Sequence, residues 1–554
     1  MFDIDMLVEE ISNSVRGGRT PLQAVKHMSM MMGTTPEADE ALKQALKKFE
    51  EKTGRIRTLK DPAVMANREL AEWYAGPSPD DKFWNALNNY LLNKKKWNPK
   101  AFTSLDDAST RIVSLLQPPG KPEIKTKGLV VGYVQSGKTA NFTAVIAKAA
   151  DVNYKFFIVL SGITNSLRSQ TQKRLETELS ELNPQHWVTL TTRTDDFRKG
   201  AAGNVDAFLT DHQNLRVLCV IKKNATVLKR LLEWLDGASN HVLASCPVLI
   251  IDDEADQASV NASKDAENKR TVINKRLIEI LKRLPKAAYV GYTATPFANV
   301  LIDPTADDLY PKDFIVSLPK PEDYFGAERI FGRERLWNEE TGGSEIILDM
   351  IRVVPNDEVQ LLQPGRKQKD VFEPELSTSL QEAITYFWMA AAARMARGQS
   401  DQHISMLIHS TMFTVVHDST KPLIENLQKK IVRQIQRQDE LLLSQMRMQW
   451  NNEQQNVQSQ EFGELPLSFE EIEPHILDVI QNTLVIVDNY KSQQRLSYEG
   501  DALIQIVIGG NALSRGLTLE GLTVSYFIRT ASAYDTLLQM GRWFGYRKGY
   551  ADIT

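Results

Sequence analysis

The stretch that decides the fold is Gly132-Tyr-Val-Gln-Ser-Gly137-Lys138-Thr139. It has the spacing G-x-x-x-x-G-K-[ST] of a phosphate-binding P-loop. An apolar run typical of a buried strand leads into it from Gly128, and a helix-like stretch follows from Ala140 to Ala150. Strand, glycine loop and helix in this order form the context in which such a loop holds phosphate, because glycines let backbone N–H groups approach the phosphate oxygens. The stretch therefore predicts a nucleotide site.

The side chains of this loop have separate expected tasks. Lys138 is predicted to reach the β- and γ-phosphates, and Thr139 to offer its hydroxyl to Mg²⁺. The positive end of the following helix favours the same anion. The other loop residues that we expect at the nucleotide are Gly132, Gln135, Ser136 and Gly137. The expected cofactors are ATP and Mg²⁺.

The bulk composition sets the class of protein. A chain of 554 residues is too long for one core, so two to four domains are expected. The net charge is −4, so any nucleic-acid binding requires a local basic groove. No apolar run approaches the roughly 20 residues of a membrane-spanning helix, and the acidic start differs from a signal peptide. Cys219 and Cys246 are predicted to be core residues, and a cytoplasmic protein without a membrane partner is expected.

A second cluster of polar residues lies about 110 residues after the P-loop, in Val248-Leu-Ile-Ile-Asp252-Asp253-Glu254-Ala255-Asp256. Asp253 is predicted to hold Mg²⁺, and Glu254 to orient or deprotonate the attacking water. An Asp-Glu pair after a strand is most often a solvated turn. Its place after a P-loop favours the second half of a nucleotide-hydrolysing site.

Two further segments complete this pattern. Tyr292-Thr293-Ala294-Thr295-Pro296 follows a predicted strand, and its two hydroxyls are expected to sense the acidic motif by hydrogen bonding; the alternative is a simple turn. Gln539-Met-Gly541-Arg542-Trp-Phe-Gly-Tyr-Arg547 offers arginines for a transferring phosphoryl group. Arg542 is the favoured arginine finger and Arg547 the second candidate, with Gln539 and Gly541 also placed at the nucleotide.

The order of these motifs resembles that of superfamily-two helicases and translocases, which implies two RecA-like lobes with ATP between them. Ser161-Gly-Ile-Thr164-Asn-Ser-Leu167-Arg168-Ser-Gln170 resembles their first-lobe nucleic-acid motif. Ile508-Gly-Gly-Asn511-Ala-Leu-Ser514-Arg515-Gly516-Leu517 resembles the second-lobe motif that couples nucleic acid to ATP. The resemblance implies nucleic-acid contacts by Thr164, Arg168 and Gln170, and coupling by Thr293, Thr295, Ser514, Arg515 and Gly516.

The chain resembles the Z-one domain family of bacterial proteins more closely, through the P-loop stretch, the stretch 508–516 and the stretch 539–547. This family implies a motor linked to restriction-modification or antiviral defence, with a nuclease, methyltransferase or MutL-like ATPase as partner. The stretch 539–547 departs from helicase spacing, with one residue between Gln539 and Gly541 and four between Arg542 and Arg547. Because the sequence stops directly after it, we expect a C-terminally truncated chain.

The expected fold class is α/β, with two RecA-like P-loop lobes. The predicted parts are a helical N-terminal domain (1–125), the first lobe (126–300), an irregular insertion or linker (301–380) and the second lobe (381–554), incomplete at its end. A helical insertion is predicted at about 423–481, with one long amphipathic helix from Leu427 to Trp450. The polar stretch after it, Asn451 to Gln460, is either a projecting arm or a decoration packed on the lobe.

Three functions compete. The first is an ATP-driven translocase or helicase-like motor on double-stranded DNA. The second is an ATP-dependent switch that gates a partner nuclease without processive movement. The third, an RNA helicase, is suggested by the Asp-Glu-Ala-Asp string alone, and no RNA-binding module accompanies it.

Overall fold

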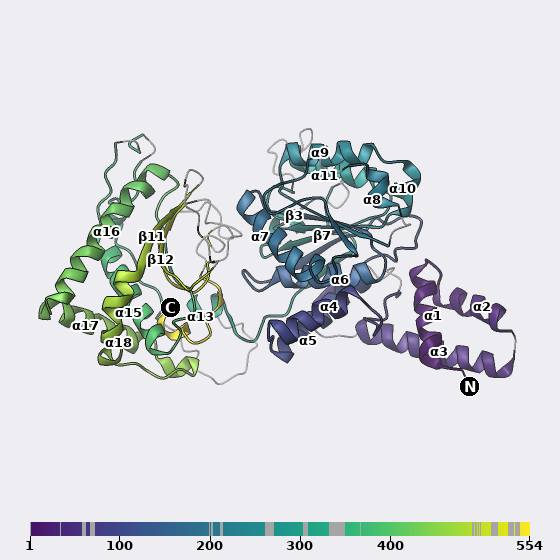
Figure 1. The fold of residues 1–554 in the computed structure, drawn as a ribbon, viewed down its shortest axis with the longest axis horizontal. Coiled ribbons are helices and arrows are strands. Elements are labelled where there is room, and N and C mark those ends of the chain that lie inside the picture. The colour runs from purple at the N-terminus through teal and green to yellow at the C-terminus, as the bar shows by residue number, and fades with distance from the viewer. Residues whose placement is uncertain are drawn as a thin grey trace. The chain divides into compact units, whose positions relative to one another are not determined.

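A computed structural model of the chain describes residues 2–554 except for 34, 58–62, 67–71, 199, 201–202, 211–213, 261–270, 303–307, 332–348, 366, 370, 490–491, 493–495, 497, 499, 511–518, 530–536 and 538–542. The chain forms two compact units, Met1–Glu322 and Asp323–Thr554. Each unit is built on its own sheet (Figure 1). The predicted fold class, α/β with two RecA-like units, is confirmed.

The N-terminal unit holds a sheet in the order β1-β8-β2-β7-β6-β3-β5-β4. Neighbouring strands are parallel except for the pair β1 and β8. Such a sheet is buried on both faces, which explains the continuous apolar runs in its strands. The strands are β1 (Ala63–Ala66), β2 (Lys127–Val131), β3 (Phe156–Ser161), β4 (Trp187–Thr189), β5 (Arg216–Ile221), β6 (Val248–Asp253), β7 (Ala287–Thr293) and β8 (Phe314–Ser317).

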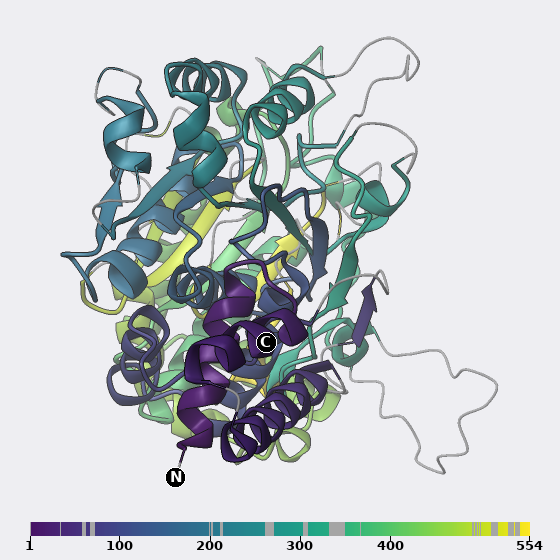
Figure 2. The ribbon, with the colours of Figure 1, turned by 90° about the vertical axis from the view of Figure 1, so that its right-hand side faces the viewer.

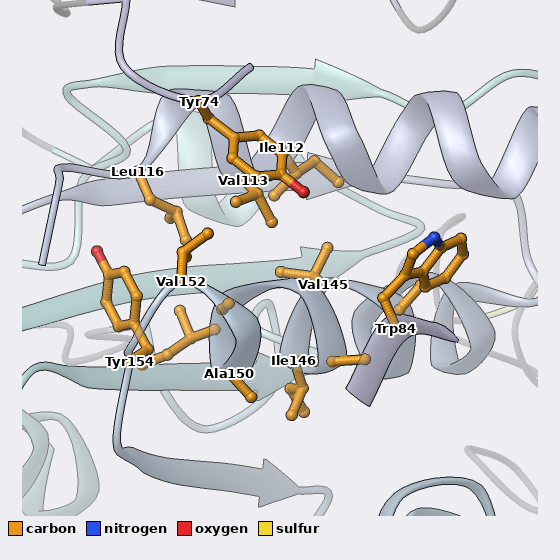
Figure 3. Packing of buried hydrophobic residues seen from close by; sticks show 14 of the residues in the cluster. Tyr74, Trp84, Ile112, Val113, Leu116, Val145, Ile146, Ala150, Val152 and Tyr154 are labelled. Atoms are coloured by element: carbon orange, nitrogen blue, oxygen red, sulfur yellow. The ribbon is translucent and has the colours of Figure 1, made fainter. Parts of the chain in front are cut away.

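Helices cover both faces of this sheet (Figure 1). Alternate residues of β3 divide between two cores, with Phe157 and Val159 facing α6 and Phe156 and Ile158 facing α9. Figure 3 shows the first core, where Val145 and Ile146 of α6 lie near Trp84 of α4 and Val113 of α5. The helices are α4 (Phe83–Asn89), α5 (Pro99–Leu115), α6 (Lys138–Asp151), α7 (Asn165–Leu175), α8 (Val205–Leu209), α9 (Ala225–Asp236), α10 (Asn240–Ser245), α11 (Val272–Arg283) and α12 (Phe297–Val300), with π-turns at Tyr90–Lys94 and Glu176–Ser180.

Three further helices begin the unit and pack side by side (Figure 2): α1 (Ile4–Arg16), α2 (Pro21–Met32) and α3 (Pro36–Arg57). Asp3 caps α1, because its carboxylate accepts from the backbone N–H groups of Asp5 and Met6. Thr20 and Gln23 form a reciprocal capping box at the start of α2. The N-terminal region is therefore largely helical, as predicted, with the short strand β1 added.

The C-terminal unit holds a parallel sheet in the order β11-β12-β10-β13. Its strands are β10 (Ile404–His409), β11 (Thr483–Asp488), β12 (Ile504–Gly509) and β13 (Leu522–Phe527), and its main helices are α15 (Thr378–Ala396), α16 (Thr414–Gln436), α17 (Glu440–Asn456) and α18 (Phe469–Asn482). Shorter elements are β9 (Tyr324–Phe325), β14 (Gly545–Tyr546), α13 (Ala327–Phe331), α14 (Asn356–Val359) and 3₁₀ turns at Ser459–Phe462 and Ala551–Ile553. Strand β14 pairs with β9.

Two sequence predictions need correction here. The long helix from Leu427 to Trp450 is two helices, because Gln438 adopts a φ of 55° and Asp439 caps α17. Trp450 is fully buried and donates its indole N–H to Leu467 O at 2.8 Å, so α17 packs on its unit and does not project as an arm. Strand β8 lies in the segment 301–380 that was expected to be irregular, yet it pairs with β2.

The expectation for the two cysteines is confirmed. Cys219 and Cys246 are buried free thiols. Among the described helices, none is long and apolar enough to cross a membrane.

Candidate functional site

Three of the predicted motifs follow neighbouring strands of the N-terminal sheet. Strand β7 lies between β2, which leads into the P-loop, and β6, which leads into the acidic turn. The end of β7 holds both loops: Gly132 N donates to Thr293 O at 2.9 Å, and Ala255 N donates to Tyr292 O at 2.9 Å. Because the strands are parallel, their carboxyl ends share one edge, which is where ligands of open α/β sheets bind.

The P-loop turns sharply into α6. Gly137 caps the helix with a φ of 91°, and Gln135 has a φ of 58°. Both values lie in the left-handed region, which glycine enters freely and other residues do not. Lys138 Nζ donates to Tyr133 O at 3.0 Å, so its side chain folds back over the loop. A Cβ on Gly132 would stand 2.9 Å from Lys138 Cγ, so this path of the lysine requires glycine there.

The charge of Lys138 is set by its surroundings. Burial lowers the pKa of the Lys138 ammonium, and the carboxylates of Asp253, Glu254 and Asp256 oppose that shift. The acidic turn therefore lies within electrostatic reach of the P-loop lysine.

The acidic turn carries two carboxylates with different surroundings. Burial raises the pKa of Asp253 to about 6, the neighbouring Glu254 adds to the rise, and Lys138 and Lys223 oppose it. Glu254 has a φ of 55°, and its backbone N–H donates to Asp253 Oδ1 at 3.1 Å. Glu254 Oε2 is buried, and no described residue gives it a hydrogen bond. A buried carboxylate oxygen without a donor is suited to accept a proton.

Asp252, the preceding residue, is engaged elsewhere. Its carboxylate lies 2.6 Å from Lys223 Nζ, with both side chains fully buried, and accepts from Tyr289 Oη at 2.5 Å. Consecutive side chains of a strand point to opposite faces, so Asp252 and Asp253 are separated by the sheet. Sequence reasoning missed Lys223 and Tyr289. A charged pair after an apolar strand, Lys222-Lys223, was the available signal, and such a pair is usually solvated.

The Thr-Ala-Thr segment contacts the last residue of the acidic motif. Thr293 Oγ1 donates to Asp256 Oδ1 at 2.8 Å, and Thr295 Oγ1 donates to Asp256 Oδ2 at 3.1 Å. The Thr295 backbone N–H also donates to Thr293 Oγ1 at 2.9 Å. Both hydroxyls that the sequence selected thus hold one carboxylate.

The residues predicted to contact nucleic acid differ in their exposure to solvent. Thr164 caps α7 by accepting from Leu167 N, and Gln170 is exposed. Arg168 is only 2% exposed, and its guanidinium donates to Arg193 O at 2.7 Å. The expected nucleic-acid contact by Arg168 is not supported by this geometry, because the guanidinium is used to hold a loop to the sheet.

The C-terminal motif is only partly visible. Ser514, Arg515, Gly516, Gln539, Gly541 and Arg542 lie outside the described residues. Arg547 is 6% exposed and packs between the rings of Phe325 and Tyr550 in its own unit. Its Nη2 donates to Trp543 O at 3.3 Å, and burial lowers the pKa of its guanidinium. Arg547 in this position does not offer its charge to a ligand, which leaves Arg542 as the candidate finger.

The residues predicted to hold Mg²⁺ fit its usual requirements. In the part of the chain that the structure describes, no group of three His, Cys, Asp or Glu side chains could hold a metal ion. Mg²⁺ needs no such cage in nucleotide sites, since one or two carboxylates, phosphate oxygens and waters complete its shell. Asp253 and the Thr139 hydroxyl are the matching oxygen donors, both partly buried.

Comparison with protein families identifies one domain. The Z1 domain matches residues 379–554. The matched residues lie in the C-terminal unit, and the predicted resemblance to this family is confirmed over that part of the chain. No curated protein matches the chain.

Solved structures match the chain over much of its length at low identity. S. cerevisiae Dbp5 bound to RNA and ADP BeF3 is 14% identical, with 81% of this chain and 85% of that chain covered and a TM-score of 0.32. DEAD-box helicase Mss116 bound to ssRNA and UDP-BeF is 12% identical, with 82% and 72% covered and a TM-score of 0.34. T4 UvsW is 12% identical, with 79% and 63% covered and a TM-score of 0.24. Scores this low carry no inference about function.

Proposed function

We propose that the chain hydrolyses ATP at the carboxyl edge of the N-terminal sheet. The observation that supports this most is the convergence of three sequence-distant segments on adjacent strands. The P-loop lysine, the acidic turn and two hydroxyls lie at this edge, and Asp253, Glu254 and Asp256 all raise the pKa of Lys138. Phosphoryl transfer to water uses a phosphate-binding loop with its lysine together with a residue that orients or deprotonates the water, and both are candidates at this edge.

The proposed roles follow from the surroundings of each group. Lys138 binds the β- and γ-phosphates, and the backbone of 132–137 with the start of α6 surrounds them. Thr139 and Asp253 would hold Mg²⁺, which would neutralise charge on the phosphate oxygens. Glu254 Oε2 accepts the proton of the attacking water. The resemblance of the stretch 539–547 to the helicase motif supports giving Arg542 the stabilisation of the transferred phosphoryl group, and Gln539 and Gly541 contacts with the nucleotide.

The finer proposal is a motor on double-stranded DNA that belongs to a restriction or antiviral defence system. The Z1 domain at 379–554 supports it, together with the resemblance of the motifs to those of translocases. Hydrolysis would reach the nucleic acid through Thr293, Thr295, Ser514, Arg515 and Gly516. Partners of the nuclease, methyltransferase or MutL-like class, in the cytoplasm, complete the proposal.

One observation favours the alternative, an ATP-dependent switch that gates a partner nuclease. Arg168, the basic residue of the predicted nucleic-acid motif, is buried and occupied by a backbone carbonyl. A switch needs no such contact, whereas a motor must grip the backbone through other groups such as Thr164 and Gln170.

Stimulation of ATP hydrolysis by nucleic acid tests both proposals. Turnover should be measured at low salt with double-stranded DNA, single-stranded DNA and RNA, because phosphate contacts weaken steeply as salt rises. Stimulation by double-stranded DNA with displacement of a triplex strand supports the motor. Turnover that no nucleic acid raises supports the switch, and stimulation by RNA alone would overturn the DNA assignment.

A further inference from the structure

Lys223 is a fully buried lysine that follows β5, two strands away from the acidic turn. Strand β3 lies between β5 and β6. The backbone N–H of Lys223 donates to Gly162 O at 2.8 Å, on the loop after β3. The lysine is thereby fixed at the carboxyl edge of the sheet, and its side chain extends past the end of β3 to the turn after β6.

Three oxygens of that turn receive the ammonium group. Lys223 Nζ lies 2.6 Å from Asp252 Oδ1, 2.6 Å from Glu254 O and 3.1 Å from Gln257 O. The two carbonyl contacts are hydrogen bonds, and the contact with Asp252 Oδ1 is an ion pair. Two of the three acceptors are main-chain carbonyls, which means that Lys223 fixes the path of the backbone as well as one side chain.

The backbone held in this way is strained. Glu254 has a φ of 55° and Ala258 a φ of 64°. Residues other than glycine adopt such positive φ values at a cost on the order of 1 kcal/mol, so another interaction has to compensate for that cost. The Glu254 carbonyl accepts from Lys223 Nζ and also from Gln257 N at 2.8 Å. Since orienting a residue's carbonyl constrains its dihedral angles, it also constrains the direction in which the Glu254 side chain leaves the chain.

We infer that Lys223 is a positioning residue for Glu254. Its ammonium holds the turn 252–257 in the strained conformation from which the Glu254 side chain, with its buried Oε2, leaves the backbone. This inference rests on the proposed ATP hydrolysis, because it assigns Lys223 to the residue proposed to activate water. Lys223 itself contacts protein oxygens only, among the residues described.

Hydrogen exchange and turnover in Lys223→Met test the inference, with Lys148→Met as the matched control. Lys148 is also fully buried and paired with an aspartate, Asp106, so both variants remove a buried ammonium. We expect Lys223→Met to lose amide protection at 252–258 and to lower kcat on the order of 10²-fold, the effect of misplacing a reacting group by about 1 Å. Nucleotide affinity should change less than about threefold. Lys148→Met should leave both the turn and kcat unchanged.

Lys223→Arg keeps the test decisive if Lys223→Met does not fold. The planar guanidinium retains the charge but cannot place three donors as an ammonium does, so we expect a fall in kcat with the melting temperature largely kept. Asp252→Asn leaves both carbonyl contacts in place and should retain most turnover. Wild-type exchange at 252–258 in Lys223→Met or Lys223→Arg would overturn the inference, as would wild-type kcat. If the wild-type chain itself lacks turnover, the proposed function fails, and the exchange data still decide whether Lys223 holds the turn.

Discussion

Lys148 and Lys223 are both buried ammonium groups of the N-terminal unit, and each pairs with an aspartate. Lys148 Nζ lies 2.5 Å from Asp106 Oδ1, and Lys223 Nζ lies 2.6 Å from Asp252 Oδ1. Their remaining contacts differ. Lys148 donates to Asp106 O and to the hydroxyls of α5 at Ser109 and Thr110, and it lies over the Trp84 ring. Lys223 donates to main-chain carbonyls of a strained turn.

We interpret Lys148 as a structural clamp between two helices and Lys223 as a residue that positions Glu254. Lys148 joins α6 to α5 almost entirely through side chains, so its loss should loosen the contact between two helices. Burial lowers the pKa of the Lys148 ammonium to about 8 although Asp106 opposes the shift, so the clamp is held at some electrostatic cost. Lys223 fixes dihedral angles next to the proposed catalytic carboxylate. We therefore predict that substitution of Lys148 mainly lowers stability, whereas substitution of Lys223 or its neighbours mainly lowers turnover.

The largest effect on turnover is expected for Lys138→Ala. This variant removes the charge proposed to bind the β- and γ-phosphates, so hydrolysis should fall below detection in a phosphate-release assay. Lys138 Nζ donates to Tyr133 O within its own loop, so its loss should leave the melting temperature nearly unchanged. Lys148→Ala should show the opposite pattern, with a melting temperature well below that of the wild type and turnover retained. If both variants lost turnover, or both lost stability, the assignment of Lys148 to structure and of Lys138 to phosphate binding would be wrong.

Glu254→Gln is expected to have the next largest effect. Glutamine keeps the size of the side chain but cannot accept the proton of water, so kcat should fall by roughly 10²–10⁴-fold. ATP binding, followed by a fluorescent analogue, should remain near wild type. Normal turnover of Glu254→Gln would refute the proposed role of Glu254 in activating water. It would also refute the role of Lys223 as the residue that positions Glu254 for that step.

The ionisation of Asp253 should make the stability of the folded chain depend on pH. Its pKa is raised to about 6 from an ordinary value of 3.8, mainly by burial. The folded chain therefore binds this proton more tightly than the unfolded chain. Between pH 4 and pH 6 this carboxyl lowers the free energy of unfolding as pH rises, and the loss is complete above about pH 6.

Asp253→Asn should consequently stabilise the chain at pH 7.5 by about 1–3 kcal/mol, since it removes the buried charge. At pH 4 the gain should nearly vanish. Urea unfolding at the two pH values measures both. Asparagine cannot supply the carboxylate proposed to hold Mg²⁺, so turnover of Asp253→Asn should be below detection at both pH values. A gain in stability that is equal at both pH values would contradict the assigned pKa.

Local context explains which parts of the site could be predicted from sequence. The P-loop and the acidic turn each follow a strand that is long and apolar, so their place at one edge of a parallel sheet follows from periodicity and order. The proposed role of Lys223 could not be predicted from sequence. It depends on the sheet order, in which β3 lies between β5 and β6, and on the dihedral angles of Glu254. Strand β8 was missed because its four residues are too few to form a pattern. Arg168 looked like a ligand-binding residue because sequence does not show burial.

The smallest effect is expected for Thr293→Val. This variant removes one of the two hydroxyls that donate to Asp256 but keeps the volume of the side chain. Thr295 Oγ1 still donates to the same carboxylate, but the Thr295 backbone N–H loses Thr293 Oγ1 as its acceptor, so the loss of stability should be about 1–3 kcal/mol. Basal turnover should change little, whereas stimulation by nucleic acid should fall if this segment couples the two sites. The informative measurement is the ratio of stimulated to basal turnover, with Thr295→Val as the matched control at the second oxygen. An unchanged ratio in both variants would mean that the segment is a strand-terminal turn without a coupling role. The functional influence of the acidic turn would then be limited to Glu254 and the lysine that positions it.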